Sequence, residues 1–269
     1  MQGLSRIATL EQLRARIQNI EKRTPFEAPE TPRVKDKEFS VPGPGILHEV
    51  FADSARDSGA ALGFALAMSR TLMTSQRPAI LVVQAVADSQ EKGVVYGGGM
   101  VGLGLDPERI ILCRPETPIE LLWAIEEAIA CRAIAAVIAD IGDKVKALDF
   151  TASRRLSLRG ASGGSSVFLL RTGTGREATA ARLRWRIEPA VSGEKEFDPR
   201  APGSPRWRVA LEKGRLGTKR DSLEWMLDWT QDGFALVKSQ TRAGAPRGGA
   251  APLPGTQPAA LGDRLPEAG

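Results

Sequence analysis

The stretch ILHEVFADSARDSGAALGFALAM, residues 46–68, decides the fold. An apolar run leads into a short polar loop, and small and apolar residues at helical spacing follow the loop. Strand, loop and helix in this order are the layout of a phosphate-binding loop. This loop carries two aspartates, Asp53 and Asp57, and no lysine. The stretch therefore predicts the first unit of an α/β fold in which the loop lacks its main phosphate-binding side chain.

A working phosphate loop reads G-x-x-x-x-G-K-[ST], because the glycines let the backbone wrap the phosphates and the lysine neutralises their charge. In one register Ser58 takes the lysine position, and a shift by two residues puts Ala60 there. The two aspartates would repel a triphosphate at close range. Arg56 is the one base in the loop, so weak nucleotide binding stays open while hydrolysis is not expected.

Further along the chain, the apolar run AIAAVIAD ends in Asp140, which has the form of a Walker-B aspartate that positions magnesium. An acidic residue after a buried strand is also common as a helix cap, and both interpretations stay open. We treat Arg56, Ser58 and Asp140 as a degenerate nucleotide site at most. His48 is the one histidine, so the sequence offers no zinc site, and we expect no cofactor.

Strand-like and helical segments alternate between residues 46 and 171. Apolar runs fall at 46–51, 79–85, 109–113, 133–140 and 167–171, and helical segments at 59–76, 118–132 and 150–159. This alternation predicts a central, mostly parallel β-sheet flanked by helices on both faces. After Arg171 the runs become shorter and amphipathic, at 181–189, 206–214 and 234–239. They predict an antiparallel extension at one edge of the sheet.

The predicted core, residues 46–240, is flanked by two other kinds of sequence. Residues 1–23 contain a short amphipathic helix that we expect to dock on another surface, with an apolar stripe of Leu10, Leu13, Ile17 and Ile20. Residues 24–45 hold five prolines and are predicted to be a linker. Residues 241–269 contain 18 Gly, Pro or Ala among 29, which predicts a disordered tail. We expect no membrane span and a cytoplasmic location.

Basic residues gather in the second half of the chain, although the net charge is only +5. Eight arginines and a single acid, Glu177, lie between residues 154 and 186. Six of these arginines are predicted to form a basic face on one helix and one strand: Arg154, Arg155, Arg159, Arg182, Arg184 and Arg186. A solvated charged face needs no ligand, but such a face also suits phosphates or an acidic protein surface. Both interpretations stay open.

The order of these pieces resembles the core of the RecA recombinase superfamily over about residues 46–215. The landmarks are the degenerate loop, then YGGGMVGLGLDPERIILCRPETPIELLWAIEEAI, AIAAVIADI, FTASRRLSLRGASGGSSVFLLRTG and EATAARLRWRIEP. Within the superfamily the chain is similar to the ImuA family, the RecA-like accessory proteins of inducible bacterial mutagenesis cassettes. The resemblance implies a RecA-like core.

The departures from the superfamily pattern concern its catalytic and DNA-holding parts. Val86 stands where the resemblance expects a catalytic glutamate, and Arg171 stands where it expects the glutamine that senses the γ-phosphate. Only nine residues separate Asp140 from Phe150, and about five follow Arg171, where recombinases carry their two DNA-binding loops. The resemblance therefore implies a pseudo-ATPase rather than an enzyme, with at most weak contact to DNA.

What the resemblance implies about function is a non-catalytic adaptor in SOS-induced, error-prone translesion DNA synthesis. The expected partners are ImuB, a catalytically inactive relative of the Y-family polymerases, RecA as a second partner, and indirectly an error-prone C-family DNA polymerase. Three alternatives stay open: a residual nucleotide-dependent switch, a nucleic-acid-binding module that uses the arginine-rich face, and a cell-division inhibitor of the SulA type.

Overall fold

The computed structural model describes residues 39–237 except 143–146, 194, 196–197, 199–200 and 217–222, and only the backbone of 88, 89 and 91. The predicted docking helix, with Leu10, Leu13, Ile17 and Ile20, and the predicted tail both lie outside the described residues. Their boundaries therefore stay predictions.

One sheet runs through the described part of the chain. Its strands are β1 Leu47–Ala52, β2 Ala79–Gln84, β3 Ile110–Cys113, β4 Ile134–Gly142, β5 Ser166–Thr172, β6 Leu183–Ala190, β7 Arg206–Lys213, β8 Leu223–Thr230 and β9 Gly233–Leu236. They lie in the order β3-β2-β4-β5-β1-β6-β7-β8-β9. Every neighbouring pair from β3 to β6 is parallel, and every pair from β6 to β9 is antiparallel. The predicted RecA-like α/β fold, with its antiparallel edge extension, is confirmed.

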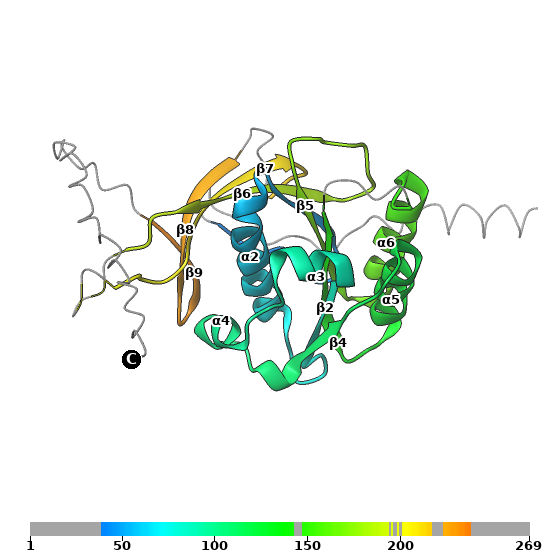
Figure 1. Ribbon diagram of the computed structural model, residues 1–269, viewed down its shortest axis with the longest axis horizontal. Helices are drawn as coiled ribbons and strands as arrows, with labels where there is room; N and C mark the ends of the chain where they lie inside the picture. Colours follow the sequence, from blue (N-terminus) through cyan, green and yellow to red (C-terminus); the bar gives the residue numbers. More distant parts are fainter. Residues whose placement is uncertain are drawn as a thin grey trace, which may run out of the picture. The chain divides into compact units, whose positions relative to one another are not determined.

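Helices cover both faces of the parallel strands (Figure 1). The helical segments are η1 Ala55–Asp57, α2 Ser58–Leu72, α3 Val86–Lys92, α4 Gly97–Gly102, η2 Pro107–Arg109, α5 Pro118–Ala130 and α6 Phe150–Gly163. The apolar cluster on one face includes α2 and α4, and the cluster on the other face includes α5 and α6. Burial on both sides explains why the parallel strands read as continuous apolar runs.

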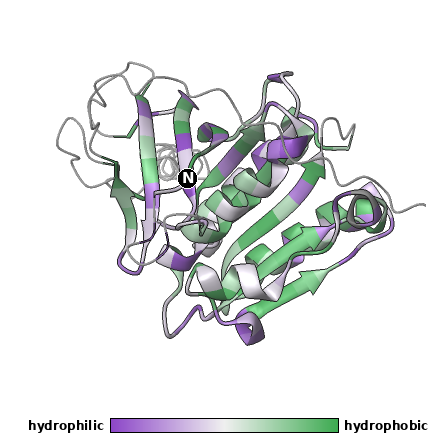
Figure 2. Cartoon of the chain, turned by 60° about the vertical axis from the view of Figure 1, so that its left-hand side comes forward, coloured by the Kyte–Doolittle hydropathy of each residue, from purple (hydrophilic) through white to green (hydrophobic). Residues whose placement is uncertain are grey.

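The central strand β1 alternates between the two faces of the sheet. Val50 belongs to the cluster on the α2 face, and Leu47 belongs to the cluster on the α6 face. In the antiparallel extension, buried and more exposed residues alternate more sharply along the strands, because the outer face of these strands is charged. Trp185, Trp207 and Trp225 are buried toward α2, while arginines and acids stand between them along the same strands. Figure 2 shows mostly hydrophobic strands between the helices and hydrophilic residues interrupting the strands of the extension.

The observed elements differ from the predicted ones at several places. The core begins inside the predicted linker, because Phe39 packs against Phe64, Trp185, Trp225 and Phe234. Helix α2 ends at Leu72 rather than 76, where the next residue takes an extended conformation. Helix α6 continues to Gly163 rather than 159. Strand β8 was not predicted, although its sequence LEWMLDWT alternates. None of the described helices has both the length and the hydropathy needed to cross a membrane.

Candidate functional site

A pocket of about 660 Å³ opens at the carboxyl ends of the parallel strands β1, β2, β4 and β5. Ligands of open parallel sheets bind at this edge. The structure brings Arg56, Ser58 and Asp140 together in the lining of this one pocket, as the degenerate nucleotide site requires. The other walls come from the first turns of α2, the segment after α3 and the end of β5. We call it the strand-end pocket.

The loop that replaces the phosphate loop is short and held by its own polar groups. The Ser54 side chain accepts from the backbone N–H of Arg56 at 3.3 Å and so caps η1. Helix α2 follows directly at Ser58. The Asp53 carboxylate forms an ion pair with Arg176 at 2.6 Å. Of the two aspartates that the sequence places against a triphosphate, Asp53 is therefore already neutralised by a side chain of this protein.

Lys92 is the feature of the pocket that the sequence did not predict. Its Nζ donates to both carboxylate oxygens of Asp140, at 3.0 and 3.2 Å. The backbone N–H of Gly142 also donates to this carboxylate, at 3.3 Å. No spacing rule connects Lys92 with Asp140, because they are 48 residues apart and meet only through the order of the strands.

Gln84 lies beside Asp140, since these two residues are paired at the ends of β2 and β4. Its Nε2 donates to the carbonyl oxygen of Gly93 at 3.0 Å. Gln84 is only 6% exposed, and its Oε1 accepts no hydrogen bond within the described structure. Because Gly93 has φ = +82°, the turn after Lys92 favours glycine. The pocket lining therefore combines a buried hydrogen-bond acceptor, the Gln84 Oε1, with Lys92, whose ammonium group is fixed on Asp140.

These residues do not fit a magnesium–nucleotide complex, the group that the superfamily resemblance implies. Ser58 supplies no charge at the lysine position of the phosphate loop. Both oxygens of Asp140 already accept from Lys92, and α3 begins with Val86 where the resemblance expects a carboxylate. No cluster of three or more His, Cys, Asp or Glu with metal-binding geometry occurs among the described residues.

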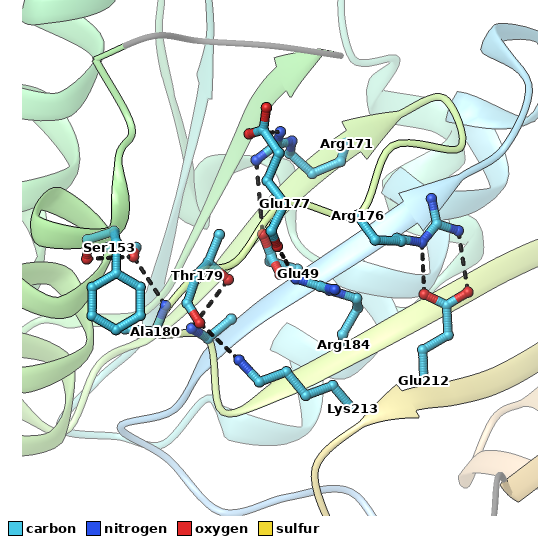
Figure 3. Close-up of polar contacts among 12 residues, drawn as sticks. Glu49, Ser153, Arg171, Arg176, Glu177, Thr179, Ala180, Arg184, Glu212 and Lys213 are labelled. Carbon is cyan, nitrogen blue, oxygen red and sulfur yellow. Dashed lines mark hydrogen bonds and ion pairs between the residues drawn. The ribbon is translucent and has the colours of Figure 1, made fainter.

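A second site-like region follows β5, where the resemblance places a DNA-binding loop. We call residues 173–182 the β5–β6 loop. Glu49, at 0% exposure, lies beneath it with Arg184 at 2.8 Å and Arg171 at 3.7 Å (Figure 3). Arg171, 2% exposed, also reaches Glu177 in the loop at 3.2 Å, and Arg184 donates to the Glu177 carbonyl oxygen. Two buried guanidinium groups thus share one buried carboxylate and hold the loop.

Three more contacts fasten the β5–β6 loop to the sheet and to α6. Arg176 bridges Asp53 at 2.6 Å and Glu212 of β7 at 2.7 Å, and its guanidinium lies 4.0 Å from the centre of the Phe51 ring. The Lys213 Nζ donates to the Thr179 carbonyl oxygen at 2.7 Å. The Ser153 hydroxyl accepts from the backbone N–H of Ala180 at 3.0 Å (Figure 3). The loop is therefore packed down on the protein at both ends.

The predicted basic face is largely an ion-pair network rather than a row of solvated cations. On α6, Arg155 and Arg159 both bind Glu126 of α5. On β6, Arg184 binds Glu49, and Arg186 binds Glu188 and Glu224. The expectation that the strand arginines line a solvated face was therefore wrong for Arg184 and Arg186, whose side chains are only 11% and 26% exposed.

Arg154 and Arg182 differ from the other four, because neither forms an ion pair with any described residue. Arg154 is exposed on α6, and Arg182 is half-buried before β6. Burial lowers the pKa of Arg182. Arg182 in turn adds to the effect of burial on His48, whose pKa falls from 6.5 to about 3. His48 accepts from the Trp185 indole at 3.1 Å within the core, which makes it a structural residue.

Comparisons with known proteins place the chain in a family. No family model matches it. The protein named Protein ImuA, in two strains of Caulobacter vibrioides, is 34% identical over 192 residues, which cover 65% of this chain and 74% of that protein. At this identity and coverage the similarity shows common family membership, in agreement with the RecA-like sheet order. The chain belongs to the ImuA family.

Proposed function

We propose that the chain is a non-catalytic adaptor in SOS-induced, error-prone translesion DNA synthesis, and that it docks ImuB and RecA. The observation that carries this proposal is the fastened β5–β6 loop. In a recombinase this segment would hold DNA. Here Arg171, Arg176 and Arg184 hold it on the protein itself, through ion pairs with acidic side chains and a hydrogen bond to the Glu177 carbonyl oxygen. A RecA-like body without a working DNA loop suits a protein that binds other proteins.

The strand-end pocket supports the same proposal from another direction. It lacks a cation at the lysine position of the phosphate loop, and its aspartate is occupied by Lys92. A pseudo-ATPase of this kind would contribute its shape and surfaces rather than turnover. We therefore expect its partner contacts to need no nucleotide, and an error-prone C-family polymerase to be reached through ImuB.

A pull-down tests the adaptor role directly. Immobilised ImuB, and separately RecA, would be incubated with the full chain after nuclease treatment and in the presence of EDTA. We expect ImuB to retain the chain under these conditions. Retention that requires DNA or magnesium–nucleotide would contradict the proposal, because the contact would then depend on a ligand rather than on a protein surface.

Two matched double variants ask whether the predicted apolar stripe makes the contact. Leu13→Glu with Ile17→Glu places two negative charges on the stripe. Ala15→Glu with Gln18→Glu places the same two charges on the predicted polar side. We expect only the first pair to reduce capture of ImuB. Equal loss in both would show that charge, not the stripe, decides binding, and removal of residues 241–269 would test the tail in the same assay.

A nucleic-acid-binding module is the second candidate, and it is favoured by the exposed Arg154 on α6, which forms no ion pair with a described residue. Neutralising Arg184 would be a poor test, because it would leave buried Glu49 without its closest partner. Arg154→Glu is cleaner, with Arg132→Glu, an exposed residue before β4, as the control for charge. If α6 binds DNA, only Arg154→Glu weakens binding and lowers the salt slope by about one. Equal binding by the wild type and both variants would exclude this face.

A further inference from the structure

We propose that Lys92 is a tethered cation that permanently occupies the position on Asp140 where a divalent metal ion would bind. The strand-end pocket would then be closed to metal–nucleotide complexes by one side chain of the protein itself. The inference concerns the pocket alone. It does not depend on which proteins the chain docks, so it can fail while the adaptor proposal stands, and the reverse.

The first support is the geometry of the ion pair. The Lys92 Nζ lies almost equally far from the two Asp140 oxygens, at 3.0 and 3.2 Å, so a metal ion on either oxygen would lie beside the ammonium group. The side chains are 21% and 16% exposed. The pair is partly screened by water, so the attraction between its charges lies between that of a surface pair and that of a buried one. A metal ion would have to displace the ammonium group or share the carboxylate with it against direct repulsion.

The second support is that Lys92 is held in place from the backbone. The ends of β2 and β4 are neighbours, and their last paired residues are Gln84 and Asp140. Gln84 binds the carbonyl oxygen of Gly93, and Asp140 binds the side chain of the residue before it. Two adjacent strand ends therefore clasp two adjacent residues. These two contacts fix the backbone at Gly93 and hold the Lys92 ammonium group against Asp140.

The third support is the donor set of the pocket. Magnesium is bound in proteins by carboxylates together with waters and substrate phosphates. Asp140 contributes the only carboxylate among the described residues that line the strand-end pocket. With Lys92 paired to it, the described lining holds no carboxylate that is free of a cation. The pocket would accept ligands only without metal, and its unsatisfied acceptor, the Gln84 Oε1, calls for a ligand that donates a hydrogen bond.

Thermal unfolding with added MgCl₂, at constant ionic strength, tests the proposal in three proteins. The wild type should show no magnesium-dependent change in melting temperature. Lys92→Met keeps most of the length of the side chain and removes its charge, so Asp140 becomes available to the metal. At magnesium ten times above its dissociation constant, the melting temperature of this variant should rise by about 3–6 °C. Adding Asp140→Asn to Lys92→Met should abolish the response.

Two outcomes would overturn the proposal. If the wild type responds to magnesium as strongly as Lys92→Met does, the lysine does not exclude the metal. If Lys92→Met is folded and does not respond, Asp140 is not a latent metal position. Should Lys92→Met fail to fold, Mn²⁺ binding to the wild type, followed by electron paramagnetic resonance, decides the matter. Binding that is lost on Asp140→Asn would disprove exclusion, and the proposal predicts no bound Mn²⁺.

Discussion

The strand-end pocket and the β5–β6 loop lie at the same edge of the sheet, yet they are built in opposite ways. The pocket is hollow, and its lining includes the buried Gln84, whose Oε1 accepts no hydrogen bond from a described residue. The loop is filled and is held through Arg171, Arg176 and Arg184. The resemblance expects moving, ligand-binding parts in both places. In the pocket, the single ion pair between Lys92 and Asp140 changes the site. The β5–β6 loop, by contrast, is fixed to the folded protein by a network of several ion pairs and hydrogen bonds.

The comparison teaches that the two regions should respond differently to mutation. Changes beneath the β5–β6 loop should mainly cost stability, because buried charges there depend on one another. Changes in the pocket should mainly affect what it binds. Predictions for Glu49 and Arg176 test this division, and one for His48 tests burial on the opposite face of β1; the largest expected effect comes first.

Glu49→Gln should be the most damaging. It leaves the guanidinium groups of Arg171 and Arg184 buried without their shared negative charge, which costs about 3–5 kcal/mol for a broken buried pair. The free energy of unfolding from urea denaturation measures the loss. Glu224→Gln serves as the control, because Glu224 binds Arg186 at 58% exposure and should cost at most about 1 kcal/mol. Similar losses in both variants would mean that the cluster under the loop is no more than a surface network.

His48 gives a pH-dependent prediction for the other face of β1. Because burial lowers its pKa from 6.5 to about 3, the unfolded chain takes up a proton below pH 6.5 and the folded chain does not. Stability is therefore fully present above pH 6.5 and falls as the pH drops toward 3. The loss from this residue between pH 7 and pH 5 should be about 2 kcal/mol.

The control for the pH effect is His48→Gln, which cannot titrate. Its unfolding free energy should change less between pH 7 and pH 5 than that of the wild type, whatever its absolute stability. Parallel pH profiles for the two proteins would show that His48 is not buried as a neutral group.

Arg176→Met should have the smallest effect on global stability, about 1 kcal/mol, because its side chain is 22% exposed and partly screened. Its effect on local opening should be clearer, since the variant cuts the ties to Asp53 and Glu212. Hydrogen exchange should accelerate at residues 174–180 and stay unchanged at 84–93 beside the pocket. Arg208→Met, at a 55% exposed arginine, is the control. Faster exchange at both regions would show that pocket and loop are not independent.

Much of the fold could be predicted from the sequence, because apolar runs and their spacing report burial directly. The five parallel strands up to Arg171 were predicted in this way, as was the change to amphipathic strands after it. The missed strand β8 was readable by the same rule, because Trp225, Leu227 and Trp229 recur at every second position and Glu224 and Asp228 lie on the opposite side.

The site was harder to predict, because its contacts join residues far apart in the chain. Residues 154–186 seemed to have an uncompensated positive charge because most of the acids that pair with their arginines lie in other segments. Glu49, Glu126 and Glu212 come from β1, α5 and β7, and no window along the sequence contains them together with their arginines. For the same reason Lys92 could be assigned to Asp140 only after the order of the strands was known.

The position of β1 has a consequence for the protein during its synthesis. The backbone N–H just before β1, at Ile46, donates to Ser166, 120 residues further along the chain, and β6 is made later still. At about 5–20 residues per second, the ribosome needs roughly 6–24 s to deliver the first partner strand. Until then both edges of β1 are unpaired, which is the condition that invites aggregation.

A charged residue within an apolar strand reduces its aggregation before its partner strands are made. Glu49 supplies that charge in the middle of LHEVFA, long before its arginine partners exist. We expect arrested nascent chains that end before residue 166 to aggregate more when they carry Glu49→Gln, and equal solubility would refute this. The Glu49 carboxylate, which later anchors the β5–β6 loop, would thus first reduce aggregation of the nascent chain.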